Sequence, residues 1–155
     1  WGSRGLGDVY KRQFVFYQNK ILLQRRALGK YHTPGLWANT CCTHPYWNEI
    51  DTDCASRRLF EELHLSDLKL ENRGQIEYRA DVGKGLIEHE VVEIFTATCS
   101  NPPKVIPNPE EVMEVKWIDQ IELASKVKLN PDEFTPWLRI YMLKHFEQIS
   151  GTITA

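Results

Sequence analysis

Residues 54–65 read CASRRLFEELHL, which has the residue spacing of an amphipathic helix. Thr52 or Asp53 is expected to provide the N-cap of this helix. Arg58 and Glu62 are four positions apart and therefore share one flank of it. The apolar residues that would face a core recur at the same spacing: Ala55, Leu59 and Leu63.

Short strands are expected before this helix. Residues 14–17 and 21–24 are apolar runs separated by a short polar turn, a pattern typical of a β-hairpin. The loop that follows, over residues 25–37, mixes basic residues with glycine and proline. It leads into a short strand near residues 38–43.

A long hairpin is expected after the helix. Residues 68–82 and 86–99 are rich in strand-forming side chains and flank a glycine-containing turn at residues 83–85. Side chains alternate along a strand, so Glu88 and Glu90 should lie on the same face.

The C-terminal third alternates loop, strand and helix signals. Four prolines in residues 102–109 predict a loop, and residues 112–118, VMEVKWI, predict a strand. After a short helix, the last helix should start at residues 130–131 or 135–136, each an Xaa-Pro step, and run to about Gln148. The whole pattern predicts an α+β sandwich, a mixed sheet with two or three helices.

The composition narrows the class of protein. The chain has 155 residues, 42% of them hydrophobic, and a formal net charge of -2. This length suits one domain, and the balanced charge argues against nucleic acid or a membrane surface as partner. No apolar run approaches the roughly 20 residues needed to cross a bilayer. The four cysteines show no C-x-x-C spacing, which argues against a disulfide framework and a zinc ribbon, so we expect the reducing cytoplasm. We also expect a monomer.

Residues 1–13, WGSRGLGDVYKRQ, differ from the rest of the chain. They contain three glycines, show no clear periodicity and pass abruptly into the strand pattern at Phe14. We interpret them as a foreign segment. The domain is then expected over residues 14–149, with a C-terminal tail over residues 150–155.

A thiol and an imidazole are two residues apart in NTCCTHP, residues 39–45. On a strand, Cys42 and His44 point to the same face, where a reactive thiol beside a metal-binding histidine is chemically sensible. The heptapeptide alone is equally consistent with a small buried cysteine and a turn histidine. Cys41 faces the other way and is expected to be structural.

Glu88 and Glu90 could hold one divalent cation, or divide metal binding and proton transfer between them. The spacing alone is a weak signal, because surface strands often carry glutamate at alternate positions. His89 lies between the two and faces the opposite side. It is expected to be structural or solvated, as are the other histidines outside the heptapeptide: His32, His64 and His145.

Basic residues of the loop and the helix could form one cationic pocket for phosphate groups: Arg25, Arg26, Lys30, Arg57 and Arg58. Glu61 and Glu62 could recruit a magnesium ion to the same phosphates. The alternative is an exposed, charged helix stabilised by ion pairs between residues four apart.

Six segments, in order and with their spacings, resemble the type I isopentenyl diphosphate isomerases of the Nudix superfamily: RRALGKYHTPGLWANTCCTHP, RRLFEEL, EYRAD, IEHE, EEVMEVKWID and FTPW. The match covers about residues 14–146. Several separate motifs recur together, which makes the resemblance specific. It implies a single-domain, Nudix-like mixed sheet between helices. It also implies an enzyme of isoprenoid synthesis that interconverts isopentenyl and dimethylallyl diphosphate.

The resemblance further implies that Cys42 and Glu90 are the catalytic acid/base pair, on opposite faces of the bound alkene. One adds a proton to the terminal carbon and the other removes a proton from the allylic carbon. Trp137 would face the carbocation, and Tyr78 would position or relay a proton near the glutamate. Protonation of an alkene gives a tertiary carbocation that water would quench, so a closed apolar site is required.

Two cation sites are implied by the same resemblance. A manganese, zinc or magnesium ion is held in the family by three histidines and two glutamates, matched here by His44, Glu88 and Glu90. Magnesium would bridge the substrate diphosphate to Glu62. The diphosphate is expected to contact three basic residues: Arg26, Lys30 and Arg58.

The chain departs from the family pattern in two places. The two other family histidines belong upstream, where residues 1–13 contain none, so we expect an incomplete metal site and loss of activity in this chain. His64 replaces a glycine that is common after the glutamates of Nudix helices, which concerns only the end of that helix.

Two alternative functions are considered. A Nudix hydrolase would also bind magnesium on the RRLFEEL helix, but Arg58 stands where hydrolases have a glutamate. Hydrolysis also has no evident use for Cys42 or Trp137. A non-catalytic phosphate-binding or metal-binding module is the second alternative, and the missing histidines favour it.

Overall fold

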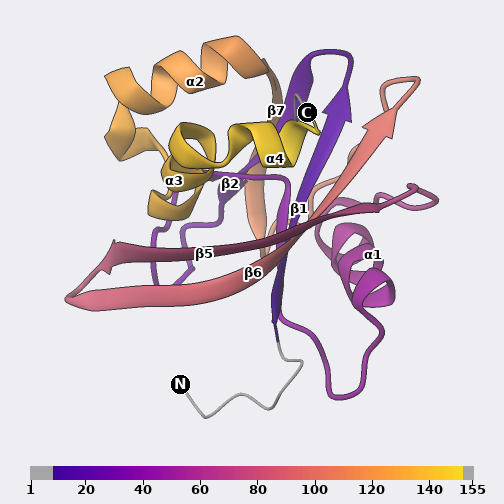
Figure 1. Cartoon of the computed structure of the whole chain (residues 1–155), viewed down its shortest axis with the longest axis horizontal. Coiled ribbons are helices and arrows are strands. Elements are labelled where there is room, and N and C mark those ends of the chain that lie inside the picture. Colours follow the sequence, from indigo (N-terminus) through magenta and orange to yellow (C-terminus); the bar gives the residue numbers. More distant parts are fainter. Residues whose placement is uncertain (1–8, 152–155) are drawn as a thin grey trace.

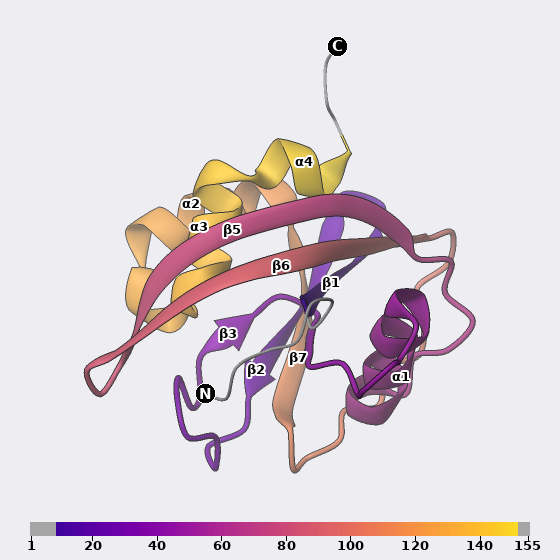
Figure 2. The same cartoon turned by 60° about the horizontal axis from the view of Figure 1, so that its bottom comes forward.

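The computed structural model describes residues 9–151. The strands in this part of the chain are β1 (Tyr10–Tyr17), β2 (Lys20–Arg26), β3 (Trp37–Ala38), β4 (Cys41–Thr43), β5 (Glu71–Gly83), β6 (Leu86–Cys99) and β7 (Val112–Asp119). They form one seven-stranded sheet in the order β3-β2-β1-β6-β5 (Figures 1 and 2). Off this path, β4 pairs with β1 and β7 pairs with β2. The pairing of β1 with β6 is parallel and the other pairings are antiparallel. The predicted mixed sheet is confirmed.

Helices cover both faces of the sheet (Figures 1 and 2). The helix α1 packs on one face, and the other three α-helices pack on the opposite face. The helical elements are α1 (Asp51–Leu63), α2 (Gln120–Leu129), the short 3-10 helix η1 (Pro131–Glu133), α3 (Pro136–Lys144) and α4 (Phe146–Ser150). The predicted sandwich of sheet and helices is confirmed. Within the described residues, no helix is long and apolar enough to cross a membrane.

The strand β1 supplies side chains to two separate cores. Phe14 and Phe16 point to the larger core, under α2, α3 and α4, whereas Val15 points to the smaller core under α1. Both sets are buried because β1 is covered on both faces. Side chains alternate between the two faces along β1, so its polar side chains are also divided between the larger and the smaller core.

The strand β1 begins four residues earlier than the sequence pattern indicates. Its first residues, Tyr10–Gln13, pair with β6, and Lys11–Gln13 pair with β4 as well. Gln13 donates to the backbone carbonyl of Ala55 at 2.9 Å and so connects the strand to α1. Residues 1–8 lie outside the described part of the chain, as do residues 152–155. The foreign origin of residues 1–13 stays a prediction.

Two helix boundaries differ from the predicted ones. The N-cap of α1 is Ile50, which has extended backbone angles and no side-chain capping bond, so Thr52 and Asp53 lie in the first turn instead. Of the two predicted starts for the last helix, Thr135 is the N-cap of α3 and accepts a hydrogen bond from the Leu138 amide at 3.3 Å. The helix then breaks at His145, where φ is -129°, and α4 follows as a separate element.

The hairpin of β5 and β6 forms as predicted. Its two-residue turn, Lys84-Gly85, has positive φ at both positions, 55° and 73°. Such a turn matches the twist of the two strands and explains the glycine at the second position. The hairpin carries Tyr78 on β5 and both predicted glutamates on β6.

Candidate active site

Strand register places Cys42 and Glu90 on the same face of the sheet. Cys42 pairs with Arg12 across β4 and β1, and Glu90 pairs with Tyr78 across β6 and β5. Both Cys42 and Tyr78 pack with the larger core, and directly paired residues share a face. The strand β1 separates β4 from β6, so their backbones are roughly 10 Å apart, or two strand spacings. Arg12 also pairs with Ile94 on β6, so Glu90 lies four residues along that strand from the level of Cys42, roughly 13 Å away in that direction. The two side chains share a face but are not directly opposite.

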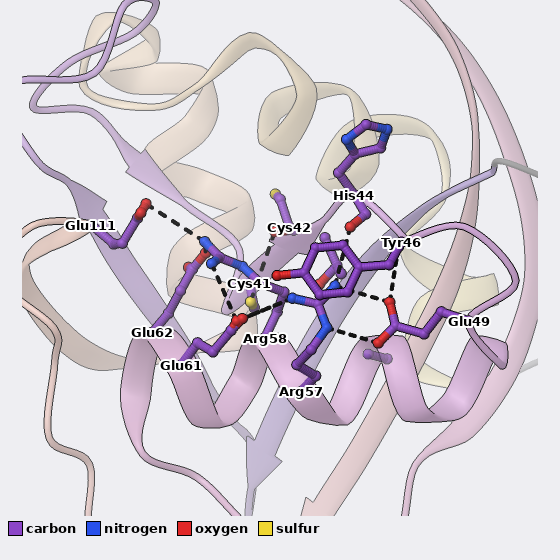
Figure 3. A network of polar contacts seen from close by, with 12 residues as sticks. Cys41, Cys42, His44, Tyr46, Glu49, Arg57, Arg58, Glu61, Glu62 and Glu111 are labelled. Atoms are coloured by element: carbon purple, nitrogen blue, oxygen red, sulfur yellow. Dashed lines mark hydrogen bonds and ion pairs between the residues drawn. The ribbon is translucent and has the colours of Figure 1, made fainter. Parts of the chain in front are cut away.

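The adjacent cysteines point to opposite sides of β4 (Figure 3). Cys41 is fully buried in the smaller core against α1, as the alternation predicts. Cys42 is half-buried on the other face, where its thiol donates to Asn39 Oδ1 at 3.5 Å. Burial raises the pKa of the Cys42 thiol above its usual value of 9.0, although the charges of Arg12 and Arg26 oppose the shift. The thiol is therefore a proton donor at neutral pH.

The guanidinium of Arg12 connects several groups on this face. It is buried and donates to the Tyr78 hydroxyl at 3.0 Å and to the Tyr141 hydroxyl at 3.1 Å. Its Nη2 also lies 3.6 Å from Glu88 Oε1. This residue brings a fixed positive charge beside the predicted glutamates.

Tyr78 links Arg12 to the glutamate strand. Its hydroxyl donates to Glu88, and burial raises the pKa of Tyr78 well above 10, so the hydroxyl stays protonated. Glu88 and Glu90 are both half-buried, whereas His89 is exposed and lies 3.8 Å from Glu77. The predicted alternation along β6 is confirmed.

Aromatic side chains of α3 cover the face that carries Cys42. Trp137 is 4% exposed, and the guanidinium of Arg26 lies 5.3 Å from its ring centroid. Tyr141, one turn later, is fully buried and meets the ring of Tyr78 edge-on at 5.4 Å. Burial lowers the pKa of Arg26, although nearby thiol and carboxylate groups oppose the shift. The result is an apolar wall with a cation at its edge.

Two of the predicted phosphate-binding residues, Lys30 and Arg58, meet at one end of α1, and Figure 3 shows Arg58 there beside Glu62 and Glu111. Arg58 bonds to Glu62 and lies 3.6 Å from Glu111, and Lys30 bonds to the same carboxylate oxygen of Glu111. Glu62 is buried, and its other oxygen accepts from Gln24 Nε2 at 2.8 Å. Lys30 and Arg58 therefore converge on one place, with two carboxylates beside them.

Arg57 has a different role from its neighbour. It donates to Glu49 at 2.7 Å and to Glu61 at 2.7 Å, and its guanidinium lies 3.7 Å from the ring centroid of Tyr46 (Figure 3). The hydrogen bond from Arg57 lowers the pKa of Glu49 to about 2. These contacts tie the loop before α1 to the helix, so Arg57 is not free for a phosphate.

Comparison with known proteins identifies the family. The NUDIX domain family matches residues 13–138. The isopentenyl-diphosphate Delta-isomerase of Dinoroseobacter shibae is 59% identical over 151 residues, which cover 97% of this chain and 86% of the relative. The enzyme of that name from Rhodobacter capsulatus is 53% identical over 152 residues, 98% of this chain and 86% of the relative. The chain belongs to the isopentenyl-diphosphate Delta-isomerase family.

Solved structures support the fold of this isomerase family member. The MutT protein of Methanosarcina mazei superimposes with a TM-score of 0.71 at 12% identity, covering 94% of this chain and 95% of that one. The MutT NUDIX hydrolase of Burkholderia pseudomallei gives a TM-score of 0.68 at 19% identity, covering 89% and 97%. At such low identities these structures show the Nudix fold alone.

The predicted metal ligands of the isomerase do not surround a common point here. The ring of His44 stands edge-on to Tyr10 with centroids 4.9 Å apart, and Glu88 faces the Arg12 guanidinium. Among residues 9–151, no three His, Cys, Asp or Glu side chains are placed to hold a metal ion. The donors, as placed here, do not fit a metal ion. A metal centre of His44, Glu88 and Glu90 is therefore not observed and stays a prediction.

Three residues that contact the candidate site were not identified from the sequence: Glu111, Arg12 and Tyr141. Glu111 belongs to the EEVMEVKWID motif and directly precedes β7. Because β7 pairs with β2, which leads into the basic loop, this position could have suggested a role for Glu111. Arg12 could have been found by extending the alternation of Phe14 and Phe16 backward by one step. Tyr141 is four residues after Trp137, so both lie on one face of a helix.

Proposed function

We propose that the reaction of this domain is the interconversion of isopentenyl and dimethylallyl diphosphate, with Cys42 and Glu90 as its proton-transfer pair. The observation that carries the proposal is their register on one sheet face, on strands that flank β1, under the aromatic cover of α3. The membership in the isomerase family supports the reaction, and the geometry supports the choice of residues.

The reaction needs one proton donor and one acceptor. In one direction the donor protonates the terminal alkene carbon, whose π electrons form the new C–H bond and leave a tertiary carbocation. The acceptor then takes a proton from the allylic carbon, and those C–H electrons form the new double bond. The raised pKa of Cys42 suits a donor, and Glu90 is the proposed acceptor.

The surroundings of the pair should protect the carbocation. Trp137 presents an aromatic face, which attracts cations, and its burial keeps water away. Tyr78 stays protonated, so its proposed role is to hold Glu88 and to position the glutamate strand through a hydrogen bond. No step is assigned to a metal ion at the His44 and glutamate positions.

The diphosphate is proposed to bind Lys30 and Arg58, which meet beside α1, together with Arg26, whose guanidinium lies against Trp137. In the free protein Lys30 is paired with Glu111, and Arg58 is paired with Glu62 and lies near Glu111. Glu62 and Glu111 are the carboxylates that would accept magnesium with the diphosphate, which would supply positive charge to the phosphate oxygens. We further propose that the protein acts as a cytoplasmic monomer on this small-molecule substrate.

Proton NMR of isopentenyl diphosphate in deuterated buffer with manganese and magnesium tests the proposal. Two proteins are compared: this chain, and a version whose residues 1–9 are replaced by the corresponding residues of the Dinoroseobacter shibae relative. Deuterium entry with formation of dimethylallyl diphosphate is expected from the second version, and from it alone if the present start disables the site. Phosphate release without isomerisation would support a hydrolase instead.

Matched variants in the active version test the residues. Cys42→Ala and Glu90→Gln should each lower turnover by at least about 100-fold, because each removes one proton-transfer group. Cys41→Ala, its neighbour in the smaller core, should keep the reaction and only lower stability. Circular dichroism checks that all variants fold. Full turnover in Cys42→Ala or Glu90→Gln would exclude this residue assignment.

A further inference from the structure

A cavity lies on the outer side of α3, away from the candidate active site. It has a volume of about 570 Å³ and is bounded by α3, the end of α2 and β5. Trp137 and Tyr141 on α3 are buried in the larger core, whereas Arg139 and Leu143 of the same helix line this cavity. Its volume is in the usual range for small-molecule sites.

Positive charge is concentrated around this cavity. Four cations line it: Arg79, Lys128, Arg139 and Lys144. One acid, Asp81, lines it as well, and its carboxylate accepts from the Gly83 amide at 2.9 Å. None of the four cations has an ion pair within residues 9–151, in contrast to Lys126, which lies 3.3 Å from Glu122. The chain as a whole has a net charge of -2, so this excess is local.

Arg139 also carries an unpaired donor. Its Nε is buried and has no hydrogen-bond acceptor in the described structure. A buried donor without an acceptor is unfavourable, and such groups commonly pair with a ligand or water instead. An anion in the cavity would provide the acceptor.

The floor of the cavity is apolar. Val127 is buried, Ile140 is half-buried, and the side chain of Leu143 is 50% exposed. Two prolines, Pro131 and Pro136, complete the apolar lining. A purely inorganic anion would leave this surface in contact with water, whereas a hydrocarbon chain would cover it.

We propose that this cavity binds an amphiphilic organic phosphate, a hydrocarbon chain that ends in a phosphate or diphosphate group. The phosphate pairs with the four cations, and the chain lies over Val127, Ile140 and Leu143. The site is separate from the candidate active site and does not require isomerase activity. The same chemistry occurs in soluble prenyl diphosphates and in anionic phospholipid headgroups, which the test distinguishes.

Amide NMR of the isotope-labelled full chain, titrated with geranyl diphosphate, tests the site. Saturable shifts are expected in residues 79–81, 127–128 and 139–144, as a set separate from shifts near Cys42. Lys128→Gln/Arg139→Gln should weaken this binding at least tenfold. The control Lys20→Gln/Lys126→Gln removes the same charge elsewhere and should leave binding unchanged.

Further probes separate the possible sources of the ligand. Inorganic diphosphate and geraniol should each bind at least tenfold more weakly than geranyl diphosphate. Sedimentation with phosphatidylglycerol vesicles, lost in Lys128→Gln/Arg139→Gln, would assign the site to a lipid headgroup. Equal binding of geranyl diphosphate by this variant and the control, without such vesicle binding, would overturn the proposal. So would equal affinity for inorganic diphosphate.

Discussion

Tyr78 holds together the two sides of the candidate site. It accepts a hydrogen bond from Arg12 at 3.0 Å and donates one to Glu88. In the active version of the protein, Tyr78→Phe removes both bonds, so we expect kcat to fall about 10- to 100-fold while KM changes less. Steady-state kinetics measures both. Tyr17→Phe, a change of the same kind far from Cys42, should leave both constants unchanged; an equal fall in the two variants would contradict the role.

Arg12 places a positive charge where the family resemblance predicts a metal. A guanidinium beside Glu88 neutralises the carboxylates that would attract a divalent ion. Arg12→Gln should therefore bind Mn²⁺ about tenfold more tightly than the parent chain, as measured by electron paramagnetic resonance of free Mn²⁺. Arg12→Lys keeps the charge and should show no gain. Equal affinity in all three proteins would exclude this competition.

Which site residues could be predicted depended on how local their signal was. Alternation along one strand correctly placed Cys41 and Cys42 on opposite faces, and the same rule separated His89 from the glutamates. Arg12 was missed because its role arises from pairing with strands that are distant in the sequence. Glu111 was missed for the same reason, since its partners Lys30 and Arg58 come from other elements.

The end of α1 shows how a departure from the family pattern is accommodated. His64 adopts the left-handed conformation that a glycine would favour there, with φ of 56°, and its ring nitrogen contacts the Ile106 carbonyl at 2.6 Å. His64→Ala loses this contact and keeps the unfavourable backbone angle. His64→Gly loses the same contact but relieves the backbone, so it should be about 1 kcal/mol more stable than His64→Ala. Chemical denaturation measures the difference; equal stabilities would exclude backbone strain at this cap.

The contribution of the loop before α1 to stability should depend on pH through the ionisation of Glu49. The pKa of Glu49 is lowered to about 2 by Arg57, so its contribution to stability is present above the usual glutamate pKa. That contribution is lost as pH falls from about 4.5 toward 2. Glu49→Gln should lower the free energy of unfolding by about 1 kcal/mol at pH 7, with the difference disappearing near pH 2. Urea denaturation across this pH range checks the trend, and a difference that grows in acid would contradict it.

Element boundaries were predicted less well than the elements themselves. The helix at residues 51–63 and the long hairpin follow from periodicity and turn residues, which act within a few positions. The N-cap was wrong because Ile50 begins the helix without a side-chain cap, so no capping signal marks the start. The break at His145 was also missed, because no proline or glycine marks it in the sequence.

At the scale of the whole molecule, the order of strands was beyond local patterns. The pairing of β1 with β6 is parallel and joins segments about 80 residues apart, and it brings Cys42 and Glu90 to one face. Nothing in the spacing of either strand specifies that register. The resemblance to a known family suggested the proposed proton-transfer partnership of these two residues, and their position on one sheet face supports it.

Lys11 ties three parts of the fold together within this sheet. It is fully buried on β1, and its ammonium lies 2.5 Å from Glu93 on β6 and 2.9 Å from Asp51 at the start of α1. Burial alone would lower the pKa of Lys11. The hydrogen bonds that Lys11 makes with Glu93 and Asp51, and the negative charges of these two residues, outweigh burial and raise the pKa above 10.5. The stabilisation that charged Lys11 provides is therefore complete at neutral pH. It is lost only as the pH rises above 10.5 and through the raised pKa.

Lys11→Met tests whether this charge or only its packing matters. The variant fills the space and leaves Glu93 without its cation, so the free energy of unfolding should fall by about 2–3 kcal/mol at pH 7. Lys11→Met/Glu93→Gln removes the unpaired charge as well and should recover part of the loss. Urea denaturation of the three proteins measures this. A single variant as stable as the parent would mean that the ion pairs do not hold β1, β6 and α1 together, and that apolar packing of the two cores is sufficient.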